Sequence, residues 1–328
     1  TLGVRCAGGT PVARVRPGRQ RWRHHGGNVF EGPFEGLPVP TGHRVMLPGR
    51  GTTFVREAPG PPGAPTVVLL HGWVASAGIN WFQVFAPLSQ HYRVLAPDLR
   101  GHGRGIRSRR RFTIEDNAAD VDTLLEVLGV DEAIVVGYSM GGPVAQMLWR
   151  NHPERVAGLV LAATGAEFVR AHERMALLAA TGLAAAAVRA GNLTRFLPTT
   201  LARQLTEAER GGRATNMVDW ARAEMGRHSM QMVAEAGVAV ANFDAKRWVH
   251  EIDVPTSVFL TLDDNAVLPD AQLALADAIP DASVHHYEGG HIACVQETFG
   301  PAIVSAIRHV ERRVSTASPG AASATGRP

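Results

Sequence analysis

The chain has 328 residues, of which 45% are hydrophobic and 19% charged, so it is long enough to bury a large core. No apolar run approaches the roughly 18 residues of a membrane span, and the N-terminus lacks a signal-peptide core, which predicts a cytoplasmic protein without a membrane span. The two cysteines, Cys6 and Cys294, are too few for a disulfide framework and have no metal-ligand spacing, which predicts no metal site.

The net charge of +3 is concentrated near the N-terminus. Residues 1–30 contain six arginines and no acidic residue, so the rest of the chain is acidic overall. Glycine and proline interrupt this basic segment, which is typical of disordered chain. We therefore predict a disordered basic leader over residues 1–40 and no nucleic-acid partner.

Strand and helix patterns alternate through the first half of the chain. Thr113, three residues before Asp116, is typical of a helix N-cap, and Gly129 of a helix end. Such alternation favours an α/β fold with a mostly parallel, doubly wound sheet, whose first part spans residues 41–165. The predicted strands are 44–47, 52–56, 66–70, 92–96, 133–136 and 156–162, and the predicted helices are 80–89, 114–128 and 143–151.

The alternation is interrupted between residues 166 and 248. Helical candidates at 175–188 and 217–240, with no convincing strand, predict an inserted helical cap or lid. Alternation then resumes over residues 249–313, with strands at 256–262 and 283–287 and helices at 271–278 and from about 301. The segment 314–328 is rich in Ser, Ala, Gly and Pro and is predicted to be a flexible tail.

The segment Gly137-Tyr138-Ser139-Met140-Gly141 joins a predicted buried strand to a predicted helix. A serine on such a tight strand-to-helix turn presents its hydroxyl to solvent, and the flanking glycines allow a close approach of the chain. The N-terminus of the following helix favours negative charge at the same place. The pattern predicts that Ser139 is a nucleophile.

A serine nucleophile needs a base and a carboxylate that orients the base. Because reacting groups gather at the carboxyl ends of the strands in open α/β sheets, both should follow later strands. His291 follows the strand 283–287 in a glycine-rich turn and is the candidate base. Asp264 follows the strand 256–262 and is the candidate acid, with Asp263 as the fallback. Histidines on helical stretches or in the tail, His228 among them, receive no catalytic role.

Acyl transfer also needs two backbone N–H groups that bind the oxyanion. The amide of Met140, directly after the nucleophile, and the amide of Trp73, after a neighbouring strand, are the candidates. In the cap, Met217, Trp220 and Met225 are candidates for an apolar acyl pocket, with ordinary helix packing as the equal alternative.

Together these motifs resemble the α/β-hydrolase-fold family, in its serine-nucleophile, esterase- or lipase-like branch with a helical cap after the sixth strand. The resemblance covers about residues 44–313 and rests on His71-Gly72-Trp73, Asp98-Leu99-Arg100-Gly101-His102-Gly103, Gly137-Tyr138-Ser139-Met140-Gly141-Gly142 and Gly290-His291. It implies a Ser139-His291-Asp264 triad, oxyanion amides at Trp73 and Met140, and no cofactor. One departure is Thr261, which stands where the family often has glycine before the acid.

The expected function is hydrolysis of a carboxylic ester, lactone or thioester with an apolar acyl group, by a bacterial enzyme. An acyltransferase or a cofactor-free haloperoxidase that forms peracids would use the same triad. A non-catalytic receptor on this fold is a further alternative. The related epoxide hydrolase and haloalkane dehalogenase branches use an aspartate nucleophile, and Ser139 argues against both. The sequence does not predict the oligomeric state.

Overall fold

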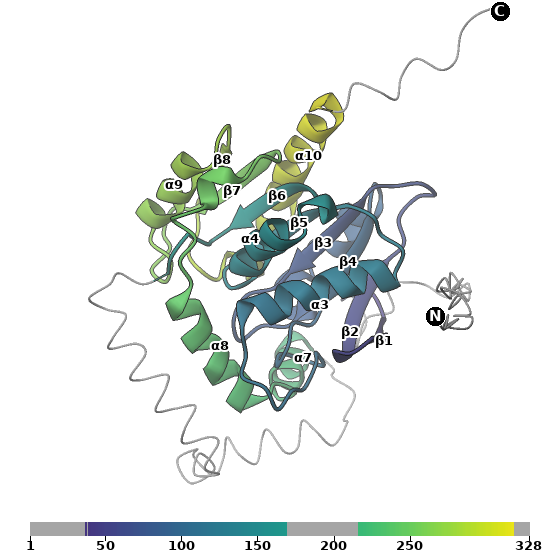
Figure 1. Ribbon diagram of the computed structural model, residues 1–328. Helices are drawn as coiled ribbons and strands as arrows, with labels where there is room; N and C mark the ends of the chain where they lie inside the picture. Colours follow the sequence, from purple (N-terminus) through teal and green to yellow (C-terminus); the bar gives the residue numbers. More distant parts are fainter. Residues whose placement is uncertain (1–36, 38, 169–215, 318–328) are drawn as a thin grey trace, which may run out of the picture.

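The computed structural model describes residues 37, 39–168 and 216–317, and its strands form one eight-stranded sheet (Figure 1). The strand order is β1-β2-β4-β3-β5-β6-β7-β8. The pairs β1–β2 and β2–β4 are antiparallel, and the remaining pairs are parallel. The predicted mostly parallel α/β sheet is therefore confirmed. The strands are β1 (Gly42–Leu47), β2 (Gly51–Ala58), β3 (Thr66–Leu70), β4 (Arg93–Pro97), β5 (Ala133–Tyr138), β6 (Val156–Ala162), β7 (Thr256–Thr261) and β8 (Ser283–Tyr287).

Helices cover both faces of this sheet, which is why the central strands β3 and β5 are almost continuous runs of buried apolar residues. One core cluster lies between the sheet and α3, α4 and α9, and a second lies between the sheet and α1, α2 and α10. The described helices are α1 (Ala77–Trp81), α2 (Phe85–Ser89), α3 (Ile114–Val127), α4 (Gly141–Asn151), α7 (Met217–Met225), α8 (Met230–Asn242), α9 (Pro269–Ala278) and α10 (Phe299–Ala317), with short 3₁₀ turns at Pro153–Arg155, Val249–Glu251 and Ala293–Val295.

The two helix-end residues that the sequence predicts, Thr113 and Gly129, lie at the ends of α3. The hydroxyl of Thr113 accepts a hydrogen bond from the backbone N–H of Asp116 at 3.0 Å, which caps α3. Gly129 follows the end of this helix with a φ of +65°, a conformation that glycine adopts without strain. The helix predicted over 80–89 is instead two short helices, α1 and α2, because the chain turns between them.

Two predicted boundaries need correction. Leu37 and Val39, which fall in the leader predicted over residues 1–40, are instead buried in the core beside α1 and α2. Residues 314–317, which fall in the tail predicted over 314–328, instead belong to α10, which continues to Ala317. The helix is extended by its apolar face, on which Val310 and Val314 still pack against the sheet and the second core cluster. Residues 1–36, 38 and 318–328 lie outside the described residues.

A helical cap is predicted in the chain between β6 and β7, and its residues 166–168 and 216–248 are described. Its first predicted helix, 175–188, lies outside the described residues. The second, predicted as one helix over 217–240, is broken into α7 and α8, because Asn216 and Ser229 each cap a separate helix start through their side chains. A β-bridge between Glu167 and Asp244 brings the two ends of this insertion together. Figure 1 shows α7 and α8 lying beyond one end of the sheet strands.

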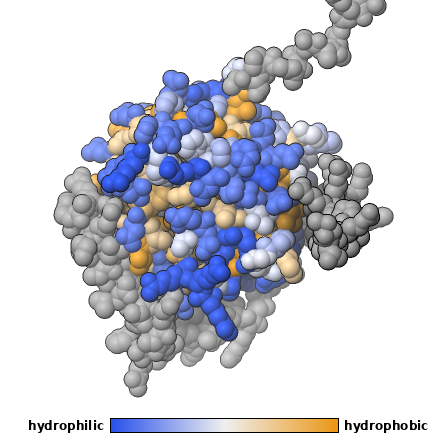
Figure 2. Space-filling model, viewed as in Figure 1, coloured by the Kyte–Doolittle hydropathy of each residue, from blue (hydrophilic) through white to orange (hydrophobic). Residues whose placement is uncertain are grey.

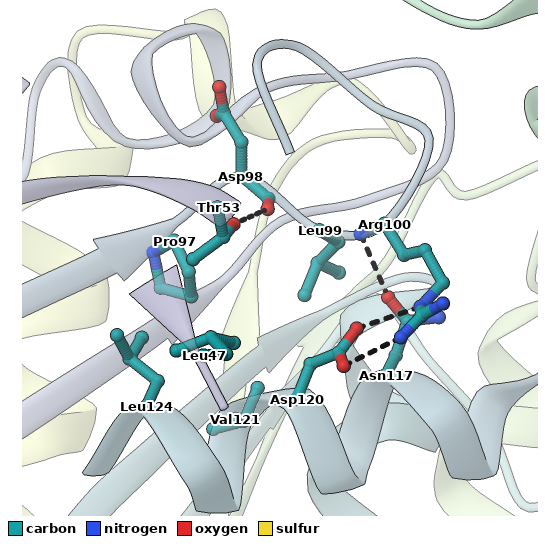
Figure 3. A pocket seen from close by; sticks show the side chains of 10 residues that line it. All are labelled: Leu47, Thr53, Pro97, Asp98, Leu99, Arg100, Asn117, Asp120, Val121 and Leu124. Atoms are coloured by element: carbon teal, nitrogen blue, oxygen red, sulfur yellow. Dashed lines mark hydrogen bonds and ion pairs between the residues drawn. The ribbon is translucent and has the colours of Figure 1, made fainter. Parts of the chain in front are cut away.

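The loop after β4 is tied to α3 by polar contacts. The guanidinium of Arg100 donates two hydrogen bonds to Asp120 at 2.7 and 2.8 Å, and its backbone N–H donates to Asn117 at 3.0 Å. Figure 3 shows these contacts beside a small cavity between the loop and α3. The buried carboxylate of Asp98 accepts hydrogen bonds from the backbone N–H groups of Ala77 and Arg104. Asp98 therefore anchors this loop to α1.

The outer surface over this side of the sheet is mostly hydrophilic, with smaller hydrophobic areas between the charged groups (Figure 2). Among the residues that the structure describes, there is no helix with both the length and the apolar character needed to cross a membrane.

Candidate active site

Ser139 lies on the sharp turn between β5 and α4, with a φ of +51°. This turn requires the glycines around it: a Cβ at Gly137 would lie 2.4 Å from the carbonyl oxygen of Gly141, and a Cβ at Gly141 would lie 2.2 Å from that of Leu70. The turn is held by hydrogen bonds from the Ser139 backbone N–H to Ala162 and from the Thr164 hydroxyl to the Ser139 carbonyl, both at 2.9 Å. The strained conformation is therefore imposed by its surroundings.

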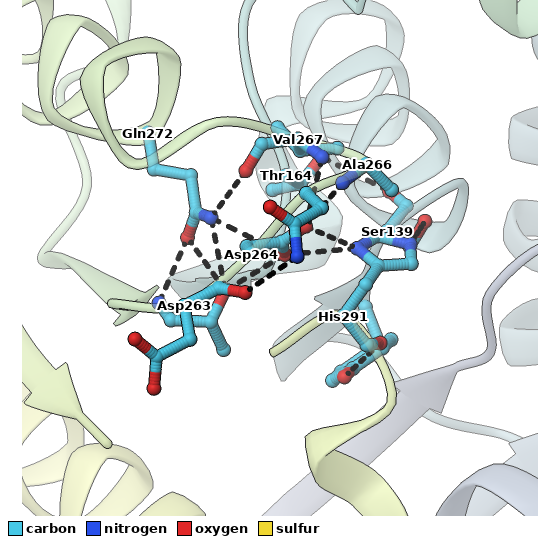
Figure 4. A network of polar contacts seen from close by, with 11 residues as sticks. Ser139, Thr164, Asp263, Asp264, Ala266, Val267, Gln272 and His291 are labelled. Atoms are coloured by element: carbon cyan, nitrogen blue, oxygen red, sulfur yellow. Dashed lines mark hydrogen bonds and ion pairs between the residues drawn. The ribbon is translucent and has the colours of Figure 1, made fainter. Parts of the chain in front are cut away.

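His291 reaches Ser139 from the loop after β8. The Ser139 hydroxyl donates to Nε2 of His291, with 2.9 Å between Oγ and Nε2 (Figure 4). The Tyr138 hydroxyl donates to the backbone carbonyl of His291 at 2.8 Å and holds the loop that carries the imidazole. Tyr138 is a positioning group that the sequence analysis missed, although its place next to the nucleophile was visible.

Asp264 lies on the opposite side of the imidazole, after β7. Nδ1 of His291 is 2.9 Å from Oδ2 of Asp264, so this nitrogen carries the proton and Nε2 is left as the acceptor for Ser139. The backbone N–H groups of Ala266 and Val267 donate to Oδ1 of Asp264 at 2.8 and 2.9 Å. Burial raises the pKa of Asp264, but the hydrogen bonds from His291 and these amides outweigh it, so that the pKa lies below its ordinary value.

The structure distinguishes between the two candidate acids. Asp264 is 2% exposed and contacts the imidazole, whereas Asp263 is exposed and its backbone N–H donates to the carbonyl of Gly289 at 3.0 Å. Of the two, Asp264 is the aspartate that the fold brings to His291.

Thr261 and Gln272 donate hydrogen bonds to Oδ2 of Asp264, the carboxylate oxygen that also contacts Nδ1 of His291. The Thr261 hydroxyl donates to Oδ2 at 2.8 Å and accepts from the Gln272 amide at 2.9 Å. The Gln272 amide also donates to Oδ2 at 3.4 Å (Figure 4). The departure from glycine at position 261 therefore adds a hydrogen-bond donor. Sequence reasoning missed Gln272, which lies on α9 and carries no motif of its own.

The two candidate oxyanion amides flank the nucleophile. Met140 is the N-cap residue of α4 and directly follows Ser139. Trp73 follows Gly72, and Gly72 lies so close to Ser139 that a Cβ on it would be 3.3 Å from the serine Cβ. Among the described residues, the backbone N–H groups of Met140 and Trp73 donate to no carbonyl or side chain, which leaves both available to an oxygen held near Ser139.

His71 holds the loop before Trp73 in place. Its Nδ1 donates to the Gly72 carbonyl at 2.8 Å, and its Nε2 accepts from the backbone N–H of Leu99 at 2.9 Å. Burial lowers the pKa of His71 to about 3, so the imidazole stays neutral. The Asn80 side chain accepts the backbone N–H of Gly72 at 2.8 Å and completes this support.

The three side chains predicted to line an acyl pocket lie in different surroundings. Trp220 is 3% exposed and packs edge-on against Phe82 in the second core cluster, which matches the alternative of ordinary helix packing. Met217 and Met225 are 38% and 45% exposed on α7. An acyl-binding role for these residues stays a prediction.

Within residues 37, 39–168 and 216–317, no three His, Cys, Asp or Glu side chains are grouped as a metal ion would require. The partly buried Cys294 thiol lies beside Tyr138, and burial raises its pKa to about 11, so it stays protonated near neutral pH.

Residues 65–298 match the family model described as the alpha/beta hydrolase fold. A relative from Variovorax paradoxus, named for carbamate hydrolysis, is 33% identical over 248 residues, which cover 74% of this chain and 90% of that protein. Epoxide hydrolase B from Mycobacterium tuberculosis is 40% identical over 123 residues, 36% of this chain. That match spans 34% of the epoxide hydrolase. A separate match of 101 residues to uncharacterized mycobacterial relatives spans 29% of their length.

Among solved structures, a hydrolase from Pseudomonas aeruginosa is similar to this chain with a TM-score of 0.65 and 26% sequence identity. The similarity covers 81% of this chain and 98% of that chain. Nearly the whole length of the Pseudomonas aeruginosa hydrolase therefore aligns with this chain.

Proposed function

The chain belongs to the alpha/beta hydrolase fold family, and on that premise we propose that it hydrolyses carboxylic esters, or related lactones and thioesters, through an acyl-enzyme on Ser139. The resemblance inferred from the sequence motifs is thereby confirmed at the level of the family. The observation that carries the proposal is the unbroken chain of hydrogen bonds from the Ser139 hydroxyl through His291 to Asp264.

The geometry supports a two-step acyl transfer. Ser139 Oγ attacks the ester carbonyl carbon while Nε2 of His291 takes the hydroxyl proton, and Asp264 stabilises the imidazolium that forms. The backbone N–H groups of Met140 and Trp73 bind the carbonyl oxygen as it becomes negative. His291 then protonates the leaving alcohol and activates a water molecule, which releases the acid and restores Ser139.

The residue type at position 139 separates this proposal from epoxide opening. The epoxide hydrolase relative shares 40% identity over 123 residues, but the epoxide hydrolase branch uses a carboxylate nucleophile. In this chain the turn carries a serine, whose attack on a carbonyl gives an ester intermediate. An acyl substrate therefore suits the site better than an epoxide.

Carbamates are a second candidate class, which the 33% identical relative from Variovorax paradoxus favours. A carbamate carbonyl would be attacked by Ser139 in the same way, with a carbamoyl-enzyme as the intermediate. Matched aryl acetates and aryl carbamates with the same leaving group separate the two classes by their kcat/KM values.

The test of the proposed function is hydrolysis of nitrophenyl esters of increasing acyl length by the purified protein. Wild type should release nitrophenol with an initial burst equal to the enzyme concentration, and S139A should lose both burst and turnover. S315A changes an exposed serine on α10 and serves as the matched control that keeps wild-type rates. Equal turnover by wild type and S139A would overturn the proposal.

The remaining expectations are proposals on the same footing. They include a small substrate with an apolar acyl group, a cytoplasmic location, and a cap formed by residues 166–248. Transfer of the acyl group to alcohols or peroxide is measured in the same assay by adding these acceptors and following the products. A protein that binds acyl compounds without turnover would instead be a receptor on this fold.

A further inference from the structure

The short segment Trp73–Ser76, which follows β3, is attached to α7 and α8 rather than to the sheet. Its first contact is the indole of Trp73, whose Nε1–H donates to the backbone carbonyl of Val233 on α8 at 2.7 Å. The same ring lies against Gly237, where a Cβ would be 2.8 Å from the indole Cζ2. The side chain of the candidate oxyanion residue is therefore held directly by the insertion between β6 and β7.

The second contact reaches the backbone of Val74 through His228, in the turn between α7 and α8. Nδ1 of His228 accepts from the backbone N–H of Gly103 at 2.7 Å, so Nε2 carries the proton and donates to the Val74 carbonyl at 3.3 Å. Burial lowers the pKa of His228, which keeps this neutral form populated.

Val74 needs such support because its backbone is strained. Its φ is +58°, a region that β-branched residues rarely adopt. A conformation of this kind persists only where surrounding contacts hold it. Since Val74 directly follows Trp73, relaxation of Val74 would reorient the peptide units on which the Trp73 N–H depends.

The third contact joins Ser76, the N-cap residue of α1, to Glu224 on α7. The Ser76 hydroxyl donates to Oε2 of Glu224 at 3.3 Å. Glu224 is 1% exposed and forms ion pairs with Arg104 at 2.8 Å and with Arg56 at 3.7 Å, both outside the insertion. These buried pairs fix α7 to the body of the protein, because breaking them would leave a charge buried without a partner.

We propose that α7 and α8 form a fixed scaffold that positions the Trp73 backbone N–H at Ser139, with the Trp73 indole and the His228 imidazole as its two positioning groups. The proposal rests on the proposed function, because it assigns this N–H to the reaction of Ser139. Under this proposal, different parts of the structure position the two oxyanion donors. The Met140 amide is set by the turn into α4, whereas the Trp73 amide depends on the insertion.

The test compares three variants of the full chain. W73F keeps a ring against Gly237 but removes the donor to Val233, and H228A removes the bridge from Gly103 to Val74. H228Q can still accept from the Gly103 N–H and donate to the Val74 carbonyl, and so should restore most of the activity lost in H228A. N242A changes an exposed residue at the end of α8 and is the matched control.

Misplacing one oxyanion donor should lower kcat by about tenfold or more while KM changes by less than about twofold, because the donor acts on the transition state. The affinity of an alkyl boronic acid, whose tetrahedral adduct on Ser139 places an oxygen in the same position, should fall in parallel. Melting temperatures of the variants separate this effect from loss of folding. If H228A does not fold, W73F decides the question.

Two failures are distinguishable. If wild type shows turnover that depends on Ser139, but W73F and H228A keep its kcat and its boronic acid affinity, the scaffold proposal is wrong and the proposed function stands. If wild type shows no turnover that depends on Ser139, both fail together. An equal loss of kcat in N242A would also overturn the scaffold proposal, because the effect would then not be specific to the contacts with Trp73 and Val74.

Discussion

Replacement of Asp264 by asparagine tests the orientation of the base while leaving the shape of the site almost unchanged. Oδ1 of Asp264 accepts two backbone N–H groups, from Ala266 and Val267, so the single oxygen of asparagine should take that place. Its NH₂ group then takes the place of Oδ2, which is 2.9 Å from Nδ1 of His291, while its oxygen takes that of Oδ1, which is 3.1 Å from the same nitrogen. The shorter contact would then join two donors. We therefore expect the tautomer in which Nδ1 accepts and the Nε2–H no longer takes the proton of Ser139.

The size of the effect follows from the loss of the base. A wrong tautomer at a serine triad costs about 10⁴ in kcat, which corresponds to about 5.5 kcal/mol of transition-state stabilisation. Stopped-flow and steady-state release of nitrophenol from D264N and wild type measure it. D263N is the matched control, because Asp263 is exposed and contacts the site only through its backbone. Retention of more than a tenth of wild-type kcat by D264N, or an equal loss in D263N, would refute the reasoning.

Three further predictions concern stability. T261V removes the hydroxyl that donates to the Asp264 carboxylate. It should lower the free energy of unfolding, measured by urea titration, by about 2 kcal/mol. An unchanged free energy of unfolding would mean that this hydrogen bond contributes nothing. Because the folded pKa of Asp264 is depressed, its contribution to stability is complete above its unfolded pKa of about 3.9 and is lost as the pH falls through the folded pKa. Urea titrations at a series of pH values should show that the free energy of unfolding falls at low pH in wild type, and falls less in D264N. G141A places a Cβ 2.2 Å from the Leu70 carbonyl and should cost about 3 kcal/mol or more, measured by circular dichroism; native stability would contradict the tight-turn argument.

The fold was predictable where local signals agree with the buried pattern of the strands. The strand 283–287 coincides with β8, and the Thr113 cap and the Gly129 end define α3 within a residue or two. The prediction failed where a boundary depends on packing. Leu37 and Val39 lie in a segment of loop-like composition, and their burial depends on packing against the core beside α1 and α2.

The candidate site divides in the same way. Ser139, Asp264 and His291 follow strands that the sequence predicts, so the common edge of a parallel sheet was enough to bring them together. The other contacts join residues that no motif links. Gln272 contacts Asp264, 8 positions earlier in the chain, and His228 contacts Val74, 154 positions earlier. No spacing rule connects such pairs, because their meeting depends on how α9 and the turn before α8 pack against the sheet and its loops.

The most direct measurement of the central claim is mass spectrometry of the intact protein after brief exposure to a fluorophosphonate, followed by peptide mapping. Wild type should form a single adduct on Ser139, S139A should form none, and H291A should be labelled much more slowly. A protein that folds normally but forms no adduct, or forms it on another residue, would contradict the claim that Ser139 is a nucleophile activated by His291.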